Sequence, residues 1–195
     1  GEGKATLGRG AIARDATQEN EYKHTIQRVT REDKLTGLSN REYFHQYVEK
    51  ECKNEDLMLV SIDLEHFREV NERYGHERGD AVLKIAAEEL GDAFPEELKV
   101  RMGGDEFGVL LRGQHPVEGV RHRVEEFQKH LQQMYAMDER MKRVVANAGI
   151  AQCKAGTPID KLIFQGNTAR AEAQKLGGGV CFVAGTDNAG SSAND

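Results

Sequence analysis

The strongest constraint on the fold is one apolar run, Leu57-Met58-Leu59-Val60-Ser61-Ile62. It has the length of a strand and does not alternate between apolar and polar residues, which is typical of a strand buried on both faces. The run ends at Asp63. Sheets of α/β and related folds commonly place ligands at the carboxyl ends of such strands. We therefore expect a central strand with a ligand site at its end.

A glycine-rich turn joins two further runs of strand length, Leu98 to Met102 and Phe107 to Leu111. Between them stands Gly103-Gly104-Asp105-Glu106. Glycine lets a backbone approach a ligand closely, and adjacent carboxylates at a turn between strands attract hard cations. The turn therefore predicts a site for phosphate and metal ions.

The remaining elements follow from the spacing of apolar residues. Helices are expected over about 40–54, 67–74, 82–90, 116–136 and 158–176, and strands over 144–151 and 180–184. This order predicts an elaborated ferredoxin-like α+β fold, in which helices flank a central, mostly antiparallel sheet. Asp63 and the turn at Gly103 then lie on neighbouring strands, so that two distant segments converge on one metal site.

Composition limits the function classes. The chain has 195 residues, enough for one substantial domain. Charged residues make up 31% of it and the net charge is -6, which argues against a broad electrostatic hold on nucleic acid but not against a nucleotide held through metal ions. The three cysteines form no CxxC pair, as expected of reduced thiols. No apolar run reaches the length of a membrane span, so we expect a cytoplasmic domain, whose parent protein could still be attached to a membrane.

Three ordered motifs narrow the assignment. They are Asp33-Lys34-Leu35-Thr36-Gly37-Leu38-Ser39-Asn40-Arg41, then Ser61 to Asn71 with Gly75-His76-Glu77-Arg78-Gly79-Asp80, and finally Gly103-Gly104-Asp105-Glu106-Phe107. Together they resemble the GGDEF domain of diguanylate cyclases over about residues 30 to 184. The resemblance implies a fold similar to nucleotidyl cyclases and polymerase palm domains, and the condensation of two GTP molecules into cyclic di-GMP with release of two pyrophosphates. It also implies two Mg²⁺ ions per active site, with Mn²⁺ as a substitute, and a homodimer in which each protomer presents one GTP.

The same resemblance assigns the metal ligands. It implies that Asp63 binds metal through its side chain, Leu64 through its backbone carbonyl and Asp105 through its carboxylate. Asp105 is also the expected general base, and Glu106 is a candidate for a further ligand. Such oxygens suit Mg²⁺, which takes its remaining ligands from water and phosphates. The alternative is that these are turn carboxylates that merely face solvent.

Guanine recognition is assigned to Asn71 and Asp80, which match the base-reading positions of the family. A carboxylate that faces the N1–H and N2–H₂ donors of guanine penalises adenine, which lacks them, so Asp80 favours GTP. His76 follows Gly75 at a helix junction and is either a ligand contact or a local structural hydrogen-bond partner.

The phosphates are expected at the start of the next helix, where the backbone amides of Glu65, His66 and Phe67 are free. Arg68 stands where the family usually has Lys. Its guanidinium either stabilises charge in the transition state or forms a surface ion pair with Glu65 or Glu72.

The chain departs from the family near its C-terminal end. Gln174 and Gly178 stand in place of the Lys and Arg of the AKxxGRN motif, which hold terminal phosphates. Lys175 is one residue out of register, about 100° around a helix. We therefore expect weaker GTP binding.

The product-inhibition motif RxxD of the family is also absent, because Phe94-Pro95-Glu96-Glu97 stands at that place. We expect no inhibition by cyclic di-GMP at this surface. Arg101 lies nearby in the sequence and is expected to be the partner of a structural ion pair.

The sequence predicts four segments. Residues 1–17 are the tail of a PAS sensor domain, since Gly10 to Thr17 resembles its last strand and DxT junction, or else a flexible leader. Residues 18–32 form a linker helix that transmits a signal, residues 33–184 form the catalytic domain, and residues 185–195 form a disordered tail. The parent protein would then be a longer sensor-cyclase.

Two alternatives to an active cyclase stay open. A GGDEF module that has lost turnover could bind GTP as a regulatory or interaction domain, which the changes at Gln174 and Gly178 favour. A cyclase that makes an adenine-containing dinucleotide is disfavoured by Asp80.

Overall fold

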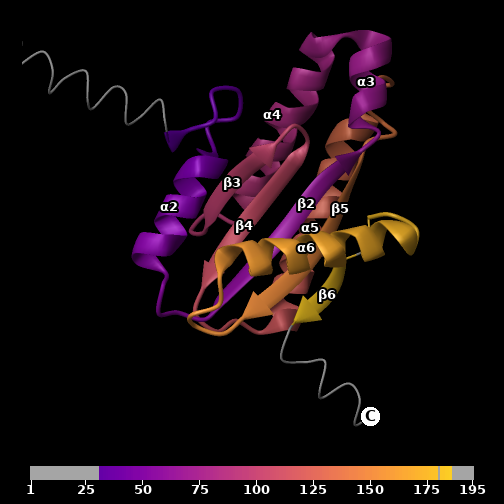
Figure 1. Ribbon diagram of the computed structural model, residues 1–195. Coiled ribbons are helices and arrows are strands. Elements are labelled where there is room, and N and C mark those ends of the chain that lie inside the picture. The colour runs from indigo at the N-terminus through magenta and orange to yellow at the C-terminus, as the bar shows by residue number, and fades with distance from the viewer. Residues whose placement is uncertain (1–30, 180, 186–195) are drawn as a thin grey trace, which may run out of the picture.

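A six-stranded sheet forms the centre of the computed structural model, which describes residues 31–179 and 181–185. The strand order is β1-β3-β4-β2-β5-β6, and β2 lies inside the sheet (Figure 1). The pairs β2–β4, β2–β5 and β3–β4 are antiparallel, whereas β1–β3 and β5–β6 are parallel, which confirms a mostly antiparallel sheet. The strands are β1 Ser39–Asn40, β2 Leu57–Glu65, β3 Leu98–Gly103, β4 Glu106–Arg112, β5 Val145–Cys153 and β6 Cys181–Gly185.

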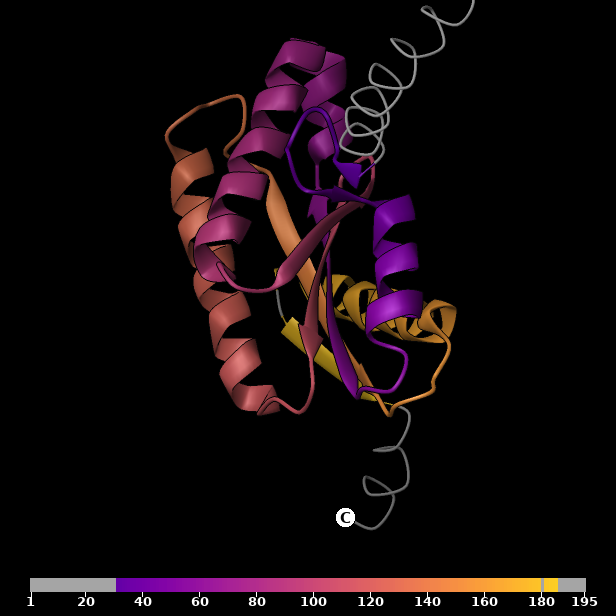
Figure 2. The same cartoon turned by 90° about the vertical axis from the view of Figure 1, so that its left-hand side faces the viewer.

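Helices cover both faces of this sheet, because β2 is apolar on both sides. On one face, Val60 and Ile62 pack in a core with α4 and α5, and on the other, Leu57 and Leu59 pack in a second core with α2 and α6. Figure 2 shows the two pairs of helices on opposite sides of the sheet. Each fully buried aliphatic side chain of this kind stabilises the fold by about 1.5–3 kcal/mol relative to exposure. The helices are α2 Arg41–Glu51, α3 Phe67–Tyr74, α4 His76–Ala93, α5 Val117–Ala136 and α6 Ile159–Lys175.

The central strand is longer than the sequence predicted. It continues through Asp63 to Glu65, so that Asp63 lies inside β2, opposite Glu106 of β4 and Asn147 of β5. The polar residues are accommodated because side chains alternate along a strand. Leu64 is buried on one face, while Asp63 and Glu65 lie on the other and are partly exposed.

Two glycines bring α6 close to the sheet. A side chain at Gly149 of β5 would put its Cβ 2.2 Å from the backbone nitrogen of Arg170, and one at Gly166 of α6 would approach the Ser61 Cβ to 3.2 Å. The backbone of α6 therefore rests on β5 and β2. This contact sets the position of Arg170 over the carboxyl end of β2.

Several expectations concern residues outside the described part of the chain. These are the PAS-like tail, the linker helix up to residue 30, and the C-terminal tail beyond residue 185. The first described helix, α2, begins after Asn40, whose Oδ1 accepts a hydrogen bond from the Tyr43 backbone N at 2.8 Å, and ends at Glu51 rather than at about residue 54. None of the helices in the described ranges is both long and apolar enough to cross a membrane.

Candidate active site

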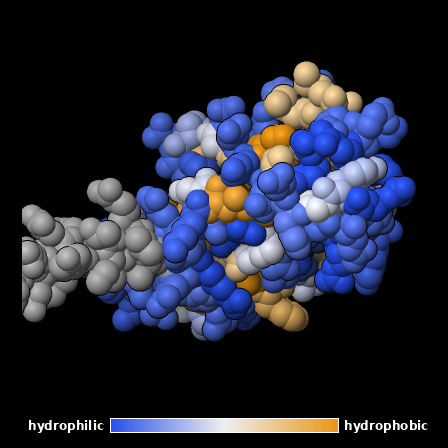
Figure 3. Space-filling view, turned by 90° about the horizontal axis from the view of Figure 1, so that it is seen from above, coloured by the Kyte–Doolittle hydropathy of each residue, from blue (hydrophilic) through white to orange (hydrophobic). Residues whose placement is uncertain are grey.

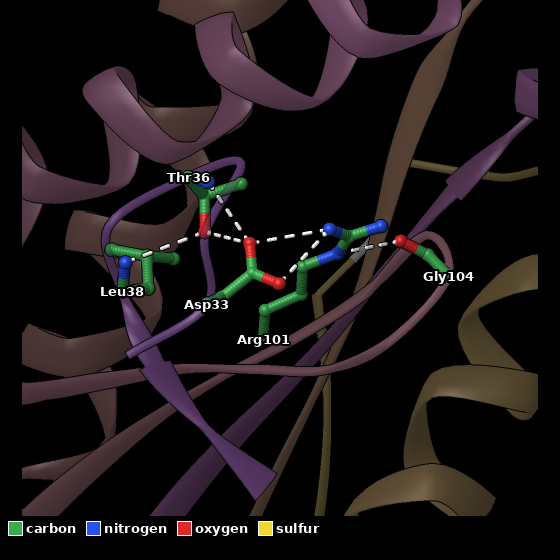
Figure 4. Close-up of polar contacts among 5 residues, drawn as sticks. All are labelled: Asp33, Thr36, Leu38, Arg101 and Gly104. Atoms are coloured by element: carbon green, nitrogen blue, oxygen red, sulfur yellow. Dashed lines mark hydrogen bonds and ion pairs between the residues drawn. The ribbon is translucent and has the colours of Figure 1, made fainter. Parts of the chain in front are cut away.

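A short loop holds the glycine-rich turn in place (Figure 4). Asp33 accepts hydrogen bonds from the backbone N and the Oγ1 of Thr36, at 2.9 and 2.7 Å, and from the Arg101 Nη1 at 3.1 and 3.2 Å. The Nε of Arg101 donates to the carbonyl of Gly104 at 3.0 Å. Arg101 is thus the structural ion-pair partner that the sequence predicted. Burial opposes ionisation of Asp33, but the hydrogen bonds from Thr36 and Arg101 outweigh it and lower the pKa of this carboxyl.

The candidate metal ligands come together at the end of the hairpin. Asp63 and Glu106 are cross-strand partners in β2 and β4, and the Leu64 backbone N donates to the Asp105 carbonyl at 3.2 Å. A shift in register between Arg101 and Gly103 precedes the turn, where Gly104 has a φ of 42°. The predicted convergence of the two segments is therefore observed.

Burial governs the electrostatics of this group. The Asp63 side chain is 20% exposed, and its Oδ1 is buried without a hydrogen-bond partner among the described residues. Burial raises the pKa of both Asp63 and Asp105, and the charge of Arg170 partly offsets this in each case, as does the Asn147 side chain at Asp63. The neighbouring carboxylate of Glu106 raises both pKa values further.

These residues suit a hard divalent ion. A buried carboxylate oxygen without a partner is an available ligand, and the other candidates also offer oxygen. Within the described ranges, no three His, Cys, Asp or Glu side chains cluster at metal-binding distance. Mg²⁺ nevertheless fits, because it is often held by one or two carboxylates and completes its octahedron with water and phosphate oxygens.

Arg170 is a site residue that the sequence analysis missed. Its Nε lies 3.6 Å from the Asp63 Oδ2, and its Nη2 lies 3.4 Å from the Glu106 Oε1. Its Nη1 donates to the Ser61 Oγ at 3.4 Å, and that hydroxyl donates to the Asn167 Oδ1 at 2.7 Å. The sequence did offer one signal for this role. Arg170 is a positively charged residue that directly follows Ala169, on the apolar face of the helix predicted over 158–176.

The base-reading candidates lie at the junction of α3 and α4. A Cβ at Gly79 would fall 1.7 Å from the Asn71 Oδ1, so the Asn71 side chain lies directly against the first turn of α4, next to Asp80. Only a glycine leaves room for it there. His76 is exposed, and its side chain has no hydrogen-bond or ion-pair partner among the described residues, so the local structural bond considered above is not observed.

The turn between β2 and α3 has an unusual backbone. His66, the N-cap of α3, has a φ of 72° and is the only described residue other than glycine with a positive φ. This conformation costs about 1–3 kcal/mol and is frequent at functional sites. The side chain of Glu65 accepts a hydrogen bond from the Asn147 Nδ2 at 3.2 Å. Phe67 then begins α3, and the first backbone N–H groups of this helix have no hydrogen-bond partner within the helix itself.

Arg68 follows on the exposed side of α3. No ion pair joins it to Glu65 or Glu72 in the described structure, and its charge is near enough to lower the pKa of Asp105. Of the two predicted alternatives, the surface ion pair is therefore not observed.

The C-terminal end of α6 provides little charge to the site. Lys175 is 73% exposed and lies 3.4 Å from Glu172. Gly178 has a φ of 77°, and a Cβ there would lie 3.2 Å from the Glu65 Oε2. An arginine at position 178 would be strained at this φ. The backbone of the loop therefore does not suit an arginine side chain at this position.

The surface around residues 94–97 is occupied by internal contacts. Glu97 lies 2.8 Å from the Arg123 Nη2, and the Arg123 guanidinium lies 4.4 Å from the centre of the Phe94 ring. Lys99 donates to the carbonyls of Phe94 and Glu97. Both nearby cations thus have partners within the chain.

The family follows from the comparison with family models, since the model "Diguanylate cyclase, GGDEF domain" matches residues 30–179. The chain belongs to the GGDEF family. Its fold is that of known GGDEF domains, because a crystal structure of the coiled coil and GGDEF domain of DgcB from Caulobacter crescentus, in complex with c-di-GMP, superposes with a TM-score of 0.77. That structure is 23% identical in sequence, and the match covers 89% of this chain and 98% of the other. The predicted fold class is thereby confirmed.

Two curated relatives come from Shewanella oneidensis, of which one is named a diguanylate cyclase and the other a cyclic di-GMP phosphodiesterase. Diguanylate cyclase DgcS is 36% identical over 91 residues, which is 42% of this chain and 29% of the relative. Cyclic di-GMP phosphodiesterase PdeB is 36% identical over 110 residues, which is 55% of this chain and 13% of the relative. The chain thus matches less than a third of the length of either relative.

Proposed function

We propose that this GGDEF domain is a diguanylate cyclase that condenses two GTP molecules into cyclic di-GMP and two pyrophosphates. The observation that carries the proposal is the cross-strand pairing of Asp63 in β2 with Glu106 in β4, next to Asp105, which brings three carboxylates to the same end of the sheet. Solvent-facing turn carboxylates, the alternative, would not leave the Asp63 Oδ1 buried and without a partner.

The residues divide the work of the reaction. Asp63, Asp105 and the Leu64 carbonyl would hold divalent ions, with Glu106 as a further ligand. When bound, the ions lower the pKa of the ribose 3'-hydroxyl and neutralise charge on the α-phosphate and the leaving pyrophosphate. Asp105 accepts the hydroxyl proton, a role that suits a carboxyl whose pKa burial has raised.

The turn and helix that follow β2 bind the substrate. Backbone amides at the β2–α3 turn, from Glu65 at the end of β2 to Phe67 at the start of α3, hold the β- and γ-phosphates, and Arg68 stabilises the charge that develops there. Asn71 and Asp80 read the guanine edge from α3 and α4. We also assign nucleotide contacts to the exposed side chains of His76 and Lys175.

Two copies of the domain complete one reaction. Each protomer presents one GTP, so the two half-sites face one another in a homodimer. The end of the molecule that carries the β2–α3 turn is mainly hydrophilic, with separate small apolar patches (Figure 3). Such a surface suits a transient dimer rather than an obligate one. A PAS domain upstream would control how the two copies meet, and the site would act in the cytoplasm.

The second candidate is a GTP-binding regulatory module without turnover. It is favoured by the absence of the expected cations at Gln174 and Gly178, and by the match to a relative named as a phosphodiesterase. Against it stands the set of Asp63, Asp105 and Asp80, whose residue types the reaction requires.

One experiment separates the two candidates. The chain is incubated with GTP, ATP and Mg²⁺, and the products are identified by mass spectrometry. We expect cyclic di-GMP, its loss in Asp105→Asn, and no change in Asp92→Asn, which alters an exposed carboxylate of α4. GTP binding without product at high protein concentration would establish the module instead.

A further inference from the structure

A single guanidinium lies among the carboxylates of the site. Arg170 is 14% exposed and approaches Asp63, Glu106 and Ser61, each through a different nitrogen, at 3.6, 3.4 and 3.4 Å. Charge-assisted hydrogen bonds to carboxylates are usually about 2.7–2.9 Å long. Arg170 therefore compensates the charge of two carboxylates without being locked to either of them.

The backbone of Arg170 cannot withdraw, but its side chain can. The close contact between Gly149 and the Arg170 nitrogen holds this part of α6 on the sheet. A cavity of about 100 Å³ lies beside the guanidinium and is lined by Arg170 and Glu106 and also by Met102, Ile163 and Asn167. Rotation about the side-chain torsions is thus the available movement.

We propose that Arg170 is a built-in counter-cation that competes with divalent metal for Asp63 and Glu106. This inference rests on the proposed function for the position of the metal site. Without metal, the guanidinium neutralises carboxylates that would otherwise repel each other. A divalent ion that binds at the Asp63 Oδ1 meets this positive charge a few ångströms away, at Oδ2, and binds weakly unless Arg170 moves aside.

The consequence is a metal site that depends on nucleotide. The triphosphate brings negative charge that compensates both the divalent ion and Arg170, so metal binds tightly only together with GTP. Free metal at low concentration leaves Arg170 in place. The same cation thereby limits occupancy of the site in the absence of substrate.

The test measures Mn²⁺ binding without nucleotide, from the electron paramagnetic resonance signal of free Mn²⁺. Removal of one positive charge near the ligands in Arg170→Met is expected to tighten binding by about tenfold or more. Lys161→Met removes the same charge from an exposed position of α6 and should leave affinity unchanged. Asp63→Asn combined with Arg170→Met should abolish the gain.

Thermal unfolding provides a second readout. Metal-free Arg170→Met should melt below the wild type, since the carboxylates lose their counter-ion, and Mn²⁺ should raise its melting temperature more than that of the wild type. If Arg170→Met does not fold, Arg170→Lys takes its place, because an ammonium on a flexible stem lacks the rigid planar fork that spans both carboxylates. It should bind Mn²⁺ more tightly than the wild type, though by less than tenfold.

Two results would overturn the inference. Equal Mn²⁺ affinity in the wild type and the Arg170 variant would show that the guanidinium does not compete, and weaker binding in the variant would show that it positions the carboxylates instead. Either result leaves the proposed function standing if the wild type still makes cyclic di-GMP from GTP. Failure of that assay is a separate outcome, which contradicts the proposed function.

Discussion

The two oxygens of the Asp63 carboxylate have different surroundings, and this difference defines the site at the scale of single residues. Oδ2 faces Arg170, whereas Oδ1 is buried without a partner among the described residues. The position of Asp63 at the end of the apolar run was enough to identify it as a ligand candidate. Arg170 could not be found in the same way, because its partner Ser61 is 109 residues away in sequence.

Gly79 also acts at this scale, and it can be tested through Asn71. In Gly79→Ala the new Cβ would fall 1.7 Å from the Asn71 Oδ1, so that side chain must rotate away from Asp80. We expect GTP affinity to fall by about tenfold or more, equivalent to one lost hydrogen bond to a charged or polar partner, with little change in melting temperature. Calorimetric titration with a non-hydrolysable GTP analogue measures the loss.

The same helix offers a matched control for this substitution. Gly91 lies in α4, and a Cβ there would meet nothing within 4 Å. Gly91→Ala should leave nucleotide affinity unchanged and stabilise the helix by up to about 1 kcal/mol. Equal affinity in Gly79→Ala and Gly91→Ala would refute a role for Asn71 in reading the base.

At the scale of elements, the loop over 33–38 and the β3–β4 hairpin act as one unit. Asp33 joins them through Arg101, which also contacts the carbonyl of Gly104 (Figure 4). The kinds of elements were predictable from apolar spacing, but their ends were not. The strand predicted to end at Asp63 continues to Glu65, since pairing with β5 extends it.

The contact between Asp33 and Arg101 in this unit is expected to contribute to the stability of the fold in a pH-dependent way. The folded pKa of Asp33 is lowered, so its contribution is fully present above the unfolded pKa of about 3.9 and is lost as pH falls through the folded value. Asp33→Asn should reduce the free energy of unfolding by about 1–3 kcal/mol at pH 7. Urea denaturation should show this gap narrowing between pH 4 and pH 2.

The control for this experiment is Asp92→Asn on the exposed side of α4. Asp92→Asn should leave the free energy of unfolding near the wild-type value at pH 7 and at pH 2. A gap between Asp33→Asn and the wild type that stays constant from pH 7 to pH 2 would contradict the assignment of the lowered pKa to Asp33.

At the scale of the whole molecule, the proposed reaction needs two copies. We expect the specific activity for cyclic di-GMP formation to rise with protein concentration, because one domain presents only one half-site. The measurement is the initial rate over a range from nanomolar to tens of micromolar protein. A specific activity that is constant over this range would exclude a transient dimer as the active form.

The absence of product inhibition at the surface of residues 94–97 stays a prediction, and contacts within the chain give this prediction a physical basis. Glu97 and Arg123 pair with each other, and Arg123 also stacks on Phe94. Among the described residues, Arg123 is the arginine that pairs with Glu97 at this surface. A cyclic dinucleotide would have to displace these internal contacts in order to bind it.

By itself, the sequence determined the fold class, the hairpin that carries Asp105 and Glu106, and the order of the elements except the two-residue strand β1, because apolar spacing and turn residues are local properties of the chain. It also placed Asn71 and Asp80 at one junction. The tertiary structure alone decided that Arg170 lies on the carboxylates and that Gly178 cannot present a cation without strain. The first depends on how closely α6 packs on β5, and the second on the left-handed backbone at residue 178 and its contact with Glu65, so both follow from contacts between segments far apart in the chain.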